Sequence, residues 1–317
     1  MIVLFAIVIA SVAGFLLGPR ASWVMPAQDP AFAVTMFFTG TLVTTTELRD
    51  LKRKPAYVAV GLAGQFILMP LIAWLLSRFV DNDPTLQQGL LLLGCMPTAM
   101  ASNVMTVLLE GEVALAVSLT TVATILSPLV ILLVLQPLFG VQNNAKVYEI
   151  AFKALYLVAI PVTVGVAIRK KFGDRFPPWW KRAATFVAGA SITFIIFIVV
   201  VKNGAHIAKL GPNLTLILLA LNMVGYAGAH GVGHVLDWPP SVQRTITVDV
   251  GMKNAGMAAV LGQQLGGAAP IPGAIYAVLC LLTVSIALPL RKRWTQRDSD
   301  TDGAEVRNAV AARKDSV

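Results

Sequence analysis

The chain has 317 residues, of which 56% are hydrophobic and 13% are charged, and its formal net charge is +9. Soluble domains carry charge on about a quarter of their residues, so this composition excludes a soluble domain for most of the chain. The net charge does not indicate nucleic-acid binding, because Lys and Arg gather in the connections at 49–54, 169–182 and 291–297. Cytoplasmic loops have this bias. We therefore expect a multi-pass protein of the inner membrane with both termini in the cytoplasm.

Ten apolar runs follow one another along the chain, and most approach the roughly 20 residues that a spanning helix needs. They are Ile2–Leu17, Ala31–Thr46, Ala56–Phe79, Leu86–Leu109, Val113–Phe139, Val147–Ile168, Ala183–Val201, Leu214–Val235, Ile246–Leu265 and Pro272–Leu290. The first run is expected to be a helix rather than a signal peptide, because no Lys or Arg precedes it. The predicted fold is all-α, with ten transmembrane helices in one domain over 1–294. A polar tail over 295–317 is expected to be disordered.

A polar connection at 140–146 divides the ten runs into two halves of five, a first repeat of about 1–140 and a second of about 146–294. Because five is odd, the two halves are expected to cross the membrane in opposite directions. Inverted repeats of this kind bind substrate near the midplane, on helices that are interrupted at matching positions.

Two runs, the fourth and the ninth, carry polar residues at bilayer depth, in the segments 94–103 and 247–256. Pro97 removes a backbone donor from the fourth run, and Gly251 and Gly256 lower helix propensity in the ninth.

Asp249 and Lys253 lie at the same depth, where ionisable groups usually mark an ion or substrate path. Free carbonyls of a broken helix suit a cation, and its half-helix N-terminus suits an anion. The pattern predicts cation-coupled uptake of an organic anion. Alternatively, Gly and Pro only kink the helices or allow close packing, but the matching positions of the two interruptions argue against this.

Four segments resemble the signatures of the bile acid:sodium symporter family, in the same order and spacing. They are Gln65–Pro70, Gly94–Thr106, Gly111–Ser118 and Asp249–Gly256. The resemblance implies a core domain and a panel domain, with the broken helices four and nine crossing in the core beside two sodium sites. It implies a first cation site at Ser102, Asn103, Thr120 and Asp249. It implies a second site at Gln65, Asp249, the carbonyls of Val250 and Met252, and the residue at Lys253.

The chain departs from the family at these sites, with Asp249 in place of Glu, Ala116 in place of Ser, and Lys253 in place of Gln. An ammonium cannot coordinate sodium and repels it by several kcal/mol at about 4 Å in a partly buried site. We therefore expect sodium at the first site only, with the Lys253 ammonium where the second ion would bind. Three roles are open for Lys253: it carries a proton during transport, it replaces the second sodium as a fixed charge, or it forms a permanent ion pair with Asp249.

The expected substrate is a small carboxylate, such as a pantoate-like or keto acid. The last helix has apolar sequence at 274–281 where relatives often carry a His-Asn pair near the substrate. Asn254 is the best candidate for direct substrate contact, and Thr98 and Pro97 are further candidates. Sodium is the expected coupling ion, no organic cofactor is expected, and the lipid bilayer is the other partner. The sequence gives no indication of oligomeric state.

Three other functions are open. A metalloid or arsenite-type efflux protein of related fold would need a reactive thiol, and Cys95 has the suitable position. A non-transporting homologue is conceivable because the cation sites are altered. An enzyme is not expected, because the sequence has no evident pairing of nucleophile and base, and His230 and His234, which are spaced for a metal pair on one helix face, have no evident third ligand.

Overall fold

The computed structural model describes residues 2–43, 54–80, 83–139, 144–177, 179–207, 210 and 212–287, and the described residues form helices joined by turns. The α-helices are α1 (Ile2–Leu17), α2 (Gln28–Thr41), α4 (Pro55–Ala63), α5 (Met69–Ser77), α6 (Pro84–Gly94), α7 (Ala101–Leu108), α8 (Val113–Val130), α9 (Gln136–Phe139), α10 (Asn144–Ala154), α11 (Ile160–Phe172), α12 (Trp179–Ile207), α13 (Pro212–Val235), α14 (Pro240–Gly251), α15 (Ala255–Gly262) and α16 (Ile271–Ala287). Two 3₁₀ segments, η1 (Gly18–Ala27) and η6 (Gly173–Arg175), and three π-helical turns complete the described helices.

Within the described residues, each of the ten predicted runs is helical over most of its length, and the fourth and ninth runs are each divided into two helices. Five continuous helical stretches are long and apolar enough to cross a bilayer: Pro55–Ser77, Val113–Leu138, Ala145–Phe172, Trp179–Ala205 and Pro212–Val235. The all-helical, membrane-spanning class is therefore confirmed, whereas the ten-helix inverted repeat and the domain boundaries stay predictions. The expected polar tail at 295–317 lies outside the described residues.

Three spans contain a π-helical turn, and in each case a proline follows the turn by two residues. The turns are η2 (Gly64–Leu68), η3 (Ile131–Leu135) and η5 (Leu155–Ala159), followed by Pro70, Pro137 and Pro161. A proline inside a helix lacks a backbone donor, and its ring collides with the carbonyl four residues earlier. In all three spans that carbonyl belongs to the π-helical turn, whose wider winding gives it room.

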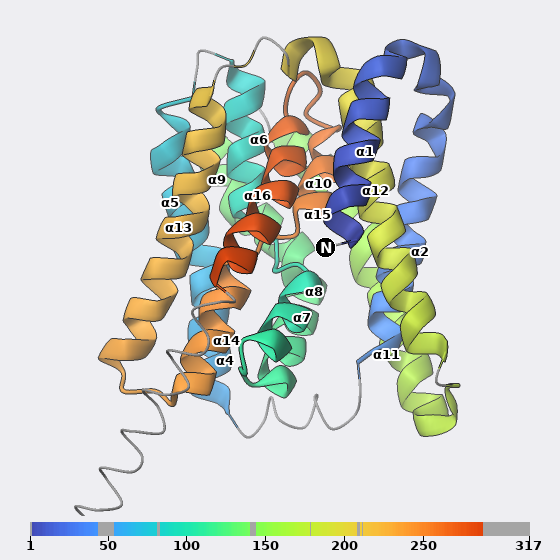
Figure 1. Ribbon diagram of the computed structural model, residues 1–317. Coiled ribbons are helices and arrows are strands. Elements are labelled where there is room, and N and C mark those ends of the chain that lie inside the picture. Colours follow the sequence, from blue (N-terminus) through green and yellow to red (C-terminus); the bar gives the residue numbers. More distant parts are fainter. Residues whose placement is uncertain are drawn as a thin grey trace, which may run out of the picture.

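The helices form two groups that Figure 1 separates clearly. On the right, α1, α2, α11 and α12 pack against one another, and on the left, α5 and α13 pack with α6, α14 and α16. Contacts of α15 with α12 join the groups near the middle of the molecule. The first halves of the two interrupted runs, α6 and α14, belong to the second group.

Helices α2 and α11 pack so closely that their backbones are in contact. A Cβ atom added to Gly40 would lie 2.1 Å from the Val162 carbonyl oxygen, and one added to Gly165 would lie 2.4 Å from the Phe37 carbonyl oxygen. Small residues give membrane helices this close contact, because van der Waals packing rather than the hydrophobic effect drives their association.

We predict that Gly40→Ala destabilises the protein, because its methyl group must push two backbones apart. Overpacking of this kind typically costs about 1–3 kcal/mol. Thermal unfolding in detergent should show a lower midpoint than for the native chain. Gly231→Ala is the matched control, because Gly231 lies inside α13 with nothing within 4 Å of an added Cβ. Equal midpoints for the two variants would contradict the close packing of α2 on α11.

Candidate functional site

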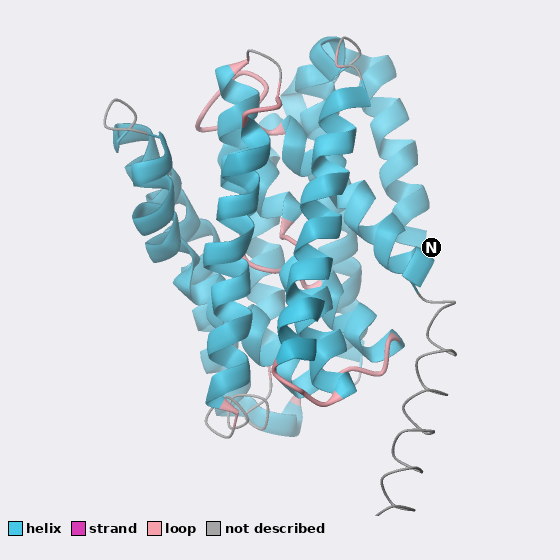
Figure 2. Ribbon diagram, turned by 90° about the vertical axis from the view of Figure 1, so that its left-hand side faces the viewer, coloured by secondary structure: helices cyan, strands magenta, loops and turns pink. Residues whose placement is uncertain are grey.

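The fourth and ninth runs are both interrupted near the middle of the molecule, where Figure 2 shows loop segments between helices. α6 ends at Gly94 and α7 begins at Ala101, while α14 ends at Gly251 and α15 begins at Ala255. Both interruptions were predicted from the sequence. Gly256, however, does not contribute to the break, because it lies inside α15 with an added Cβ 2.7 Å from Ile192.

The two interruptions pair with each other through their backbones. The Ala99 amide donates to the Met252 carbonyl and the Asn254 amide donates to the Pro97 carbonyl, both at 2.8 Å. These two bonds form an antiparallel β-bridge between Thr98 and Lys253. We call the place where the two interruptions meet at this bridge the crossing. Because lipid cannot satisfy free backbone groups, each interruption supplies the partners that the other one lacks.

The Thr98 side chain strengthens this crossing. It is fully buried, and the single proton of its hydroxyl is shared between the carbonyls of Asp249 and of Met252, the latter at 2.9 Å. The Thr98 hydroxyl, which was predicted to contact the substrate, is therefore already hydrogen-bonded to the backbone at the end of α14. Pro97 contributes its carbonyl to the bridge, and Asn254 caps α15 by accepting from the Met257 amide at 3.0 Å. Whether any of the three touches substrate stays a prediction.

Asp249 is fully buried, and side chains from three other helical segments converge on its carboxylate. Ser102 of α7 and Thr120 of α8 lie 3.1 Å and 3.3 Å from Oδ1, and Gln65 of η2 donates to Oδ2 at 2.6 Å. Asn103 joins the cluster through its Oδ1 atom, 3.3 Å from the Thr120 hydroxyl. The structure thus brings together the four residues of the first predicted cation site.

The first cluster has more acceptor oxygens than protons. The Thr120 hydroxyl has one proton, yet it faces Asp249 Oδ1, Asn103 Oδ1 and, at 2.8 Å, the Ala116 carbonyl. Buried oxygen atoms without enough donors are a suitable environment for a hard cation, which binds oxygen ligands. The residues present therefore fit a sodium ion, although the cluster's role stays a prediction.

Lys253 is also fully buried, and its ammonium donates to two backbone carbonyls rather than to the Asp249 carboxylate. These are the carbonyl of Gln65 at 2.7 Å and that of Met96 at 2.9 Å. This arrangement differs from the direct ion pair with Asp249 that was one of the three open roles. Two carbonyls from different segments hold the ammonium as they could hold a metal cation.

Gln65 contacts both the cluster around Asp249 and the ammonium of Lys253, and it also bonds to the backbone of the crossing. Its amide nitrogen donates to Asp249, its side-chain oxygen accepts from the Thr98 amide at 3.2 Å, and its backbone carbonyl accepts from Lys253. It lies in the π-helical turn η2, where widened winding makes a carbonyl accessible to a side-chain donor. Val250 and Met252, the remaining residues of the second predicted site, occupy the last turn of α14 and the break.

Two functional candidates were missed from the sequence. Asn222 of α13 and Tyr276 of α16 are fully buried, and both donate to the Gly251 carbonyl, at 3.0 Å and 2.5 Å. Asn222 is a polar residue in the middle of an apolar run, which is a usable signal. Tyr276 gave none, since a tyrosine in an apolar helix is ordinarily a packing residue.

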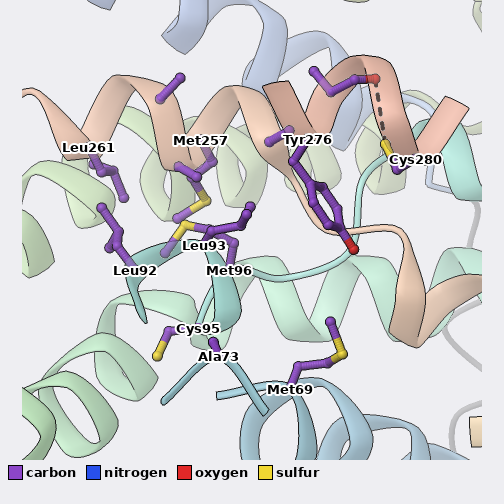
Figure 3. Packing of buried hydrophobic residues seen from close by; sticks show 14 of the residues in the cluster. Met69, Ala73, Leu92, Leu93, Cys95, Met96, Met257, Leu261, Tyr276 and Cys280 are labelled. Atoms are coloured by element: carbon purple, nitrogen blue, oxygen red, sulfur yellow. Dashed lines mark hydrogen bonds between the residues drawn. The ribbon is translucent and has the colours of Figure 1, made fainter. Parts of the chain in front are cut away.

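Apolar residues enclose the crossing. A buried cluster that includes Met69, Leu93, Met96 and Met257 packs around the two interrupted segments. Figure 3 shows these side chains, with the Tyr276 hydroxyl pointing away from the backbone of α16. The polar groups of the crossing therefore lie in a largely apolar interior, where each hydrogen bond matters more than it would in water.

The sequence matches the sodium bile acid symporter family over residues 30–210. An uncharacterized sodium-dependent transporter of Bacillus subtilis, YocS, is 26% identical over 273 residues, which is 86% of this chain and 85% of the relative. A probable sodium/metabolite cotransporter of Arabidopsis thaliana chloroplasts is 25% identical over 244 residues, and sodium/bile acid cotransporter 4 of mouse is 28% identical over 242. The chain spans 61% and 52% of these two longer proteins.

The family match covers more than half of the chain, and the first of these relatives is similar along most of its length. The matched range includes α7, which contributes Ser102 and Asn103 to the cluster around Asp249. The protein is therefore a membrane transporter homologue that belongs to the sodium bile acid symporter family.

Proposed function

We propose that the protein is a secondary transporter that couples uptake of a small organic anion to sodium by alternating access. The observation that carries this proposal is the buried cluster around Asp249, where its carboxylate, the Asn103 amide oxygen and the Ser102 and Thr120 hydroxyls converge. A sodium ion bound there would be held by the Asp249 carboxylate, the Ser102 and Thr120 hydroxyls and the Asn103 amide oxygen. The relatives described as sodium-dependent support the choice of ion.

An anionic substrate is supported by the two half-helices that begin at the crossing. α7 begins at Ala101 and α15 at Ala255, and the N-terminal ends of helices favour negative charge. A carboxylate bound near these ends would lie close to Asn254, which is half-buried. A rat relative is described as a sodium-dependent organic anion transporter, in agreement with this class of substrate.

Coupling would arise because sodium and the substrate organise the same crossing. Sodium bound at Asp249 would hold α7, α8 and α14 together and so fix the half-helix ends that bind the anion. The two helix groups suggest the moving parts, the group of α1, α2, α11 and α12 acting as the panel and the other as the core. We further propose ten spans in two inverted repeats with both termini in the cytoplasm.

Lys253 would replace a second coupling ion. Its ammonium receives two carbonyl oxygens at distances that suit a cation, but it is tethered to α14 and cannot be exchanged. A sodium ion placed beside it would be repelled by several kcal/mol at about 4 Å. Of the three roles, we therefore favour the fixed charge, with one sodium per cycle.

The purified protein in sealed vesicles should take up small carboxylates when a sodium gradient is imposed, with a Hill coefficient of about one for sodium. Asp249→Asn should raise the sodium concentration for half-maximal uptake by at least about tenfold, equivalent to about 1.4 kcal/mol. The reason is that the amide keeps the shape of the side chain but removes its charge.

Two further variants test the same site. Thr120→Val should act in the same direction as Asp249→Asn, whereas Thr121→Val is the matched control, because the Thr121 hydroxyl bonds only within α8, to the Val117 carbonyl. Uptake driven by a proton gradient alone would assign coupling to Asp249 and Lys253 instead. Absence of uptake under either gradient, across a panel of carboxylates, would contradict the proposal.

Lys253→Gln should restore a second exchangeable site, because it replaces the fixed ammonium with a neutral amide that can coordinate sodium. The Hill coefficient for sodium should then rise from about one towards two. The measurement is the initial uptake rate against sodium concentration at a saturating level of substrate. Complete loss of uptake, with the folded protein still present, would instead support proton transfer by Lys253.

Cys95→Ala should leave sodium-driven uptake nearly unchanged. The thiol is fully buried in the apolar cluster behind the crossing, beside Met96. Metalloid efflux would need this thiol to be reachable from the substrate path. Loss of uptake together with loss of arsenite extrusion in the variant would therefore favour the efflux function over the carboxylate symporter.

A further inference from the structure

Gly251, the last residue of α14, has a carbonyl that the helix itself cannot satisfy. The final carbonyls of any α-helix have no donor within the helix, and at this depth water and lipid are poor substitutes. The neighbouring carbonyls have other partners: the Thr98 hydroxyl lies against those of Asp249 and Met252, and the Val248 carbonyl accepts from the Met252 amide. Gly251 instead finds its donors on α13 and α16.

The two donors to Gly251 form a small closed network. Tyr276 Oη donates to the Gly251 carbonyl at 2.5 Å, and Asn222 Nδ2 lies 3.0 Å from the same oxygen and 3.1 Å from Tyr276 Oη. Thr283 completes the network: Asn222 Oδ1 is the nearest acceptor of its hydroxyl, at 2.7 Å, and the Leu279 and Cys280 carbonyls of α16 lie further away, at 3.0 Å and 3.2 Å. Because Thr283 occupies the amide oxygen, the amide nitrogen of Asn222 faces the break.

The backbone of Gly251 is also fixed by packing. A Cβ atom at this position would lie 2.2 Å from the Tyr226 ring, so the α14 end is pressed against α13 with no space for a side chain. Gly251 follows Asp249 by two residues. A backbone rotation at Gly251 would therefore reorient the final helical turn of α14, which includes Asp249. That movement would change the direction of the Asp249 carboxylate relative to Ser102 and Thr120.

We infer that Tyr276 and Asn222 are positioning residues for the cation site, acting through the Gly251 carbonyl. Asp249 is held from the crossing side by Gln65, Ser102 and Thr120, whereas the chain that carries it is held from the other side by α13 and α16. Neither Tyr276 nor Asn222 would coordinate the ion. They would set the affinity for sodium by fixing the end of α14 before the ion binds, as preorganised supporting residues do around metal sites. This inference rests on the proposed sodium coupling.

Tyr276→Phe tests the inference, because it removes the hydroxyl and keeps the ring. It should raise the sodium concentration for half-maximal uptake by about three- to tenfold, the effect of losing one net hydrogen bond. The KM for the carboxylate at saturating sodium should stay within about twofold of the native value. The concentration of sodium that gives half of the maximal thermal stabilisation should rise in parallel, which a loss of general stability would not produce.

Ser285→Ala is the matched control, since the Ser285 hydroxyl lies on the same helix as Tyr276 but donates within α16, to the Leu281 carbonyl at 2.6 Å. Its sodium dependence should equal that of the native protein. If Tyr276→Phe fails to fold, Thr283→Val decides the question, because it releases the Asn222 amide and should shift sodium dependence in the same direction.

The outcomes separate the two proposals. Native protein whose uptake and thermal stability are both independent of sodium would overturn the proposed function, and this inference with it. Sodium-dependent native protein with an unchanged sodium dependence in Tyr276→Phe would overturn the inference alone. An equal shift in Ser285→Ala would also overturn it, because the effect would then belong to loss of any hydroxyl from α16.

Discussion

The crossing depends on one constraint, that a backbone interrupted inside a membrane must find hydrogen-bond partners within the protein. Here the two interruptions satisfy each other through the bridge between Thr98 and Lys253. Neither break would be tolerable alone, so the positions of Asp249 and Lys253 are determined by the meeting of two distant parts of the chain. The polar side chains that gather around the bridge complete what the two backbones leave unsatisfied.

Hydrogen-bond donors and acceptors are unevenly distributed around this bridge, and their distribution determines where a cation can bind. On the Asp249 side, oxygen atoms outnumber protons, which suits an exchangeable cation. On the other side, the carbonyls of Gln65 and Met96 receive an ammonium that the chain itself supplies. Gln65 links the two regions because its amide contacts the carboxylate while its carbonyl contacts the ammonium. A buried acid and a buried base thus lie near each other without a direct bond.

Much of this could be predicted from the sequence, because hydropathy and helix-breaking residues act locally. Those rules predict the ten apolar runs and the breaks beside Pro97 and after Gly251. The resemblance to the family predicted that Ser102, Asn103 and Thr120 lie around Asp249. The contacts of Lys253 could not be predicted, because they depend on the π-helical turn that makes the Gln65 carbonyl accessible. Pro70, two residues after that turn, was its signal in the sequence. The role of Tyr276 depends on where α16 crosses the end of α14, which no local pattern encodes.

The tethered ammonium of Lys253 has a consequence for how transport would respond to voltage. In the proposed cycle, its charge would balance that of Asp249 in the empty carrier, and one sodium with one monocarboxylate would add no net charge to the pair. The proposed cycle is therefore electroneutral, and the membrane potential, worth about 2.3 kcal/mol per elementary charge at 100 mV, neither drives nor opposes it. A carrier with a neutral residue at this position and two sodium ions would draw on that potential. By fixing one cation in the polypeptide, the chain would make accumulation of its substrate depend on the sodium concentration ratio alone.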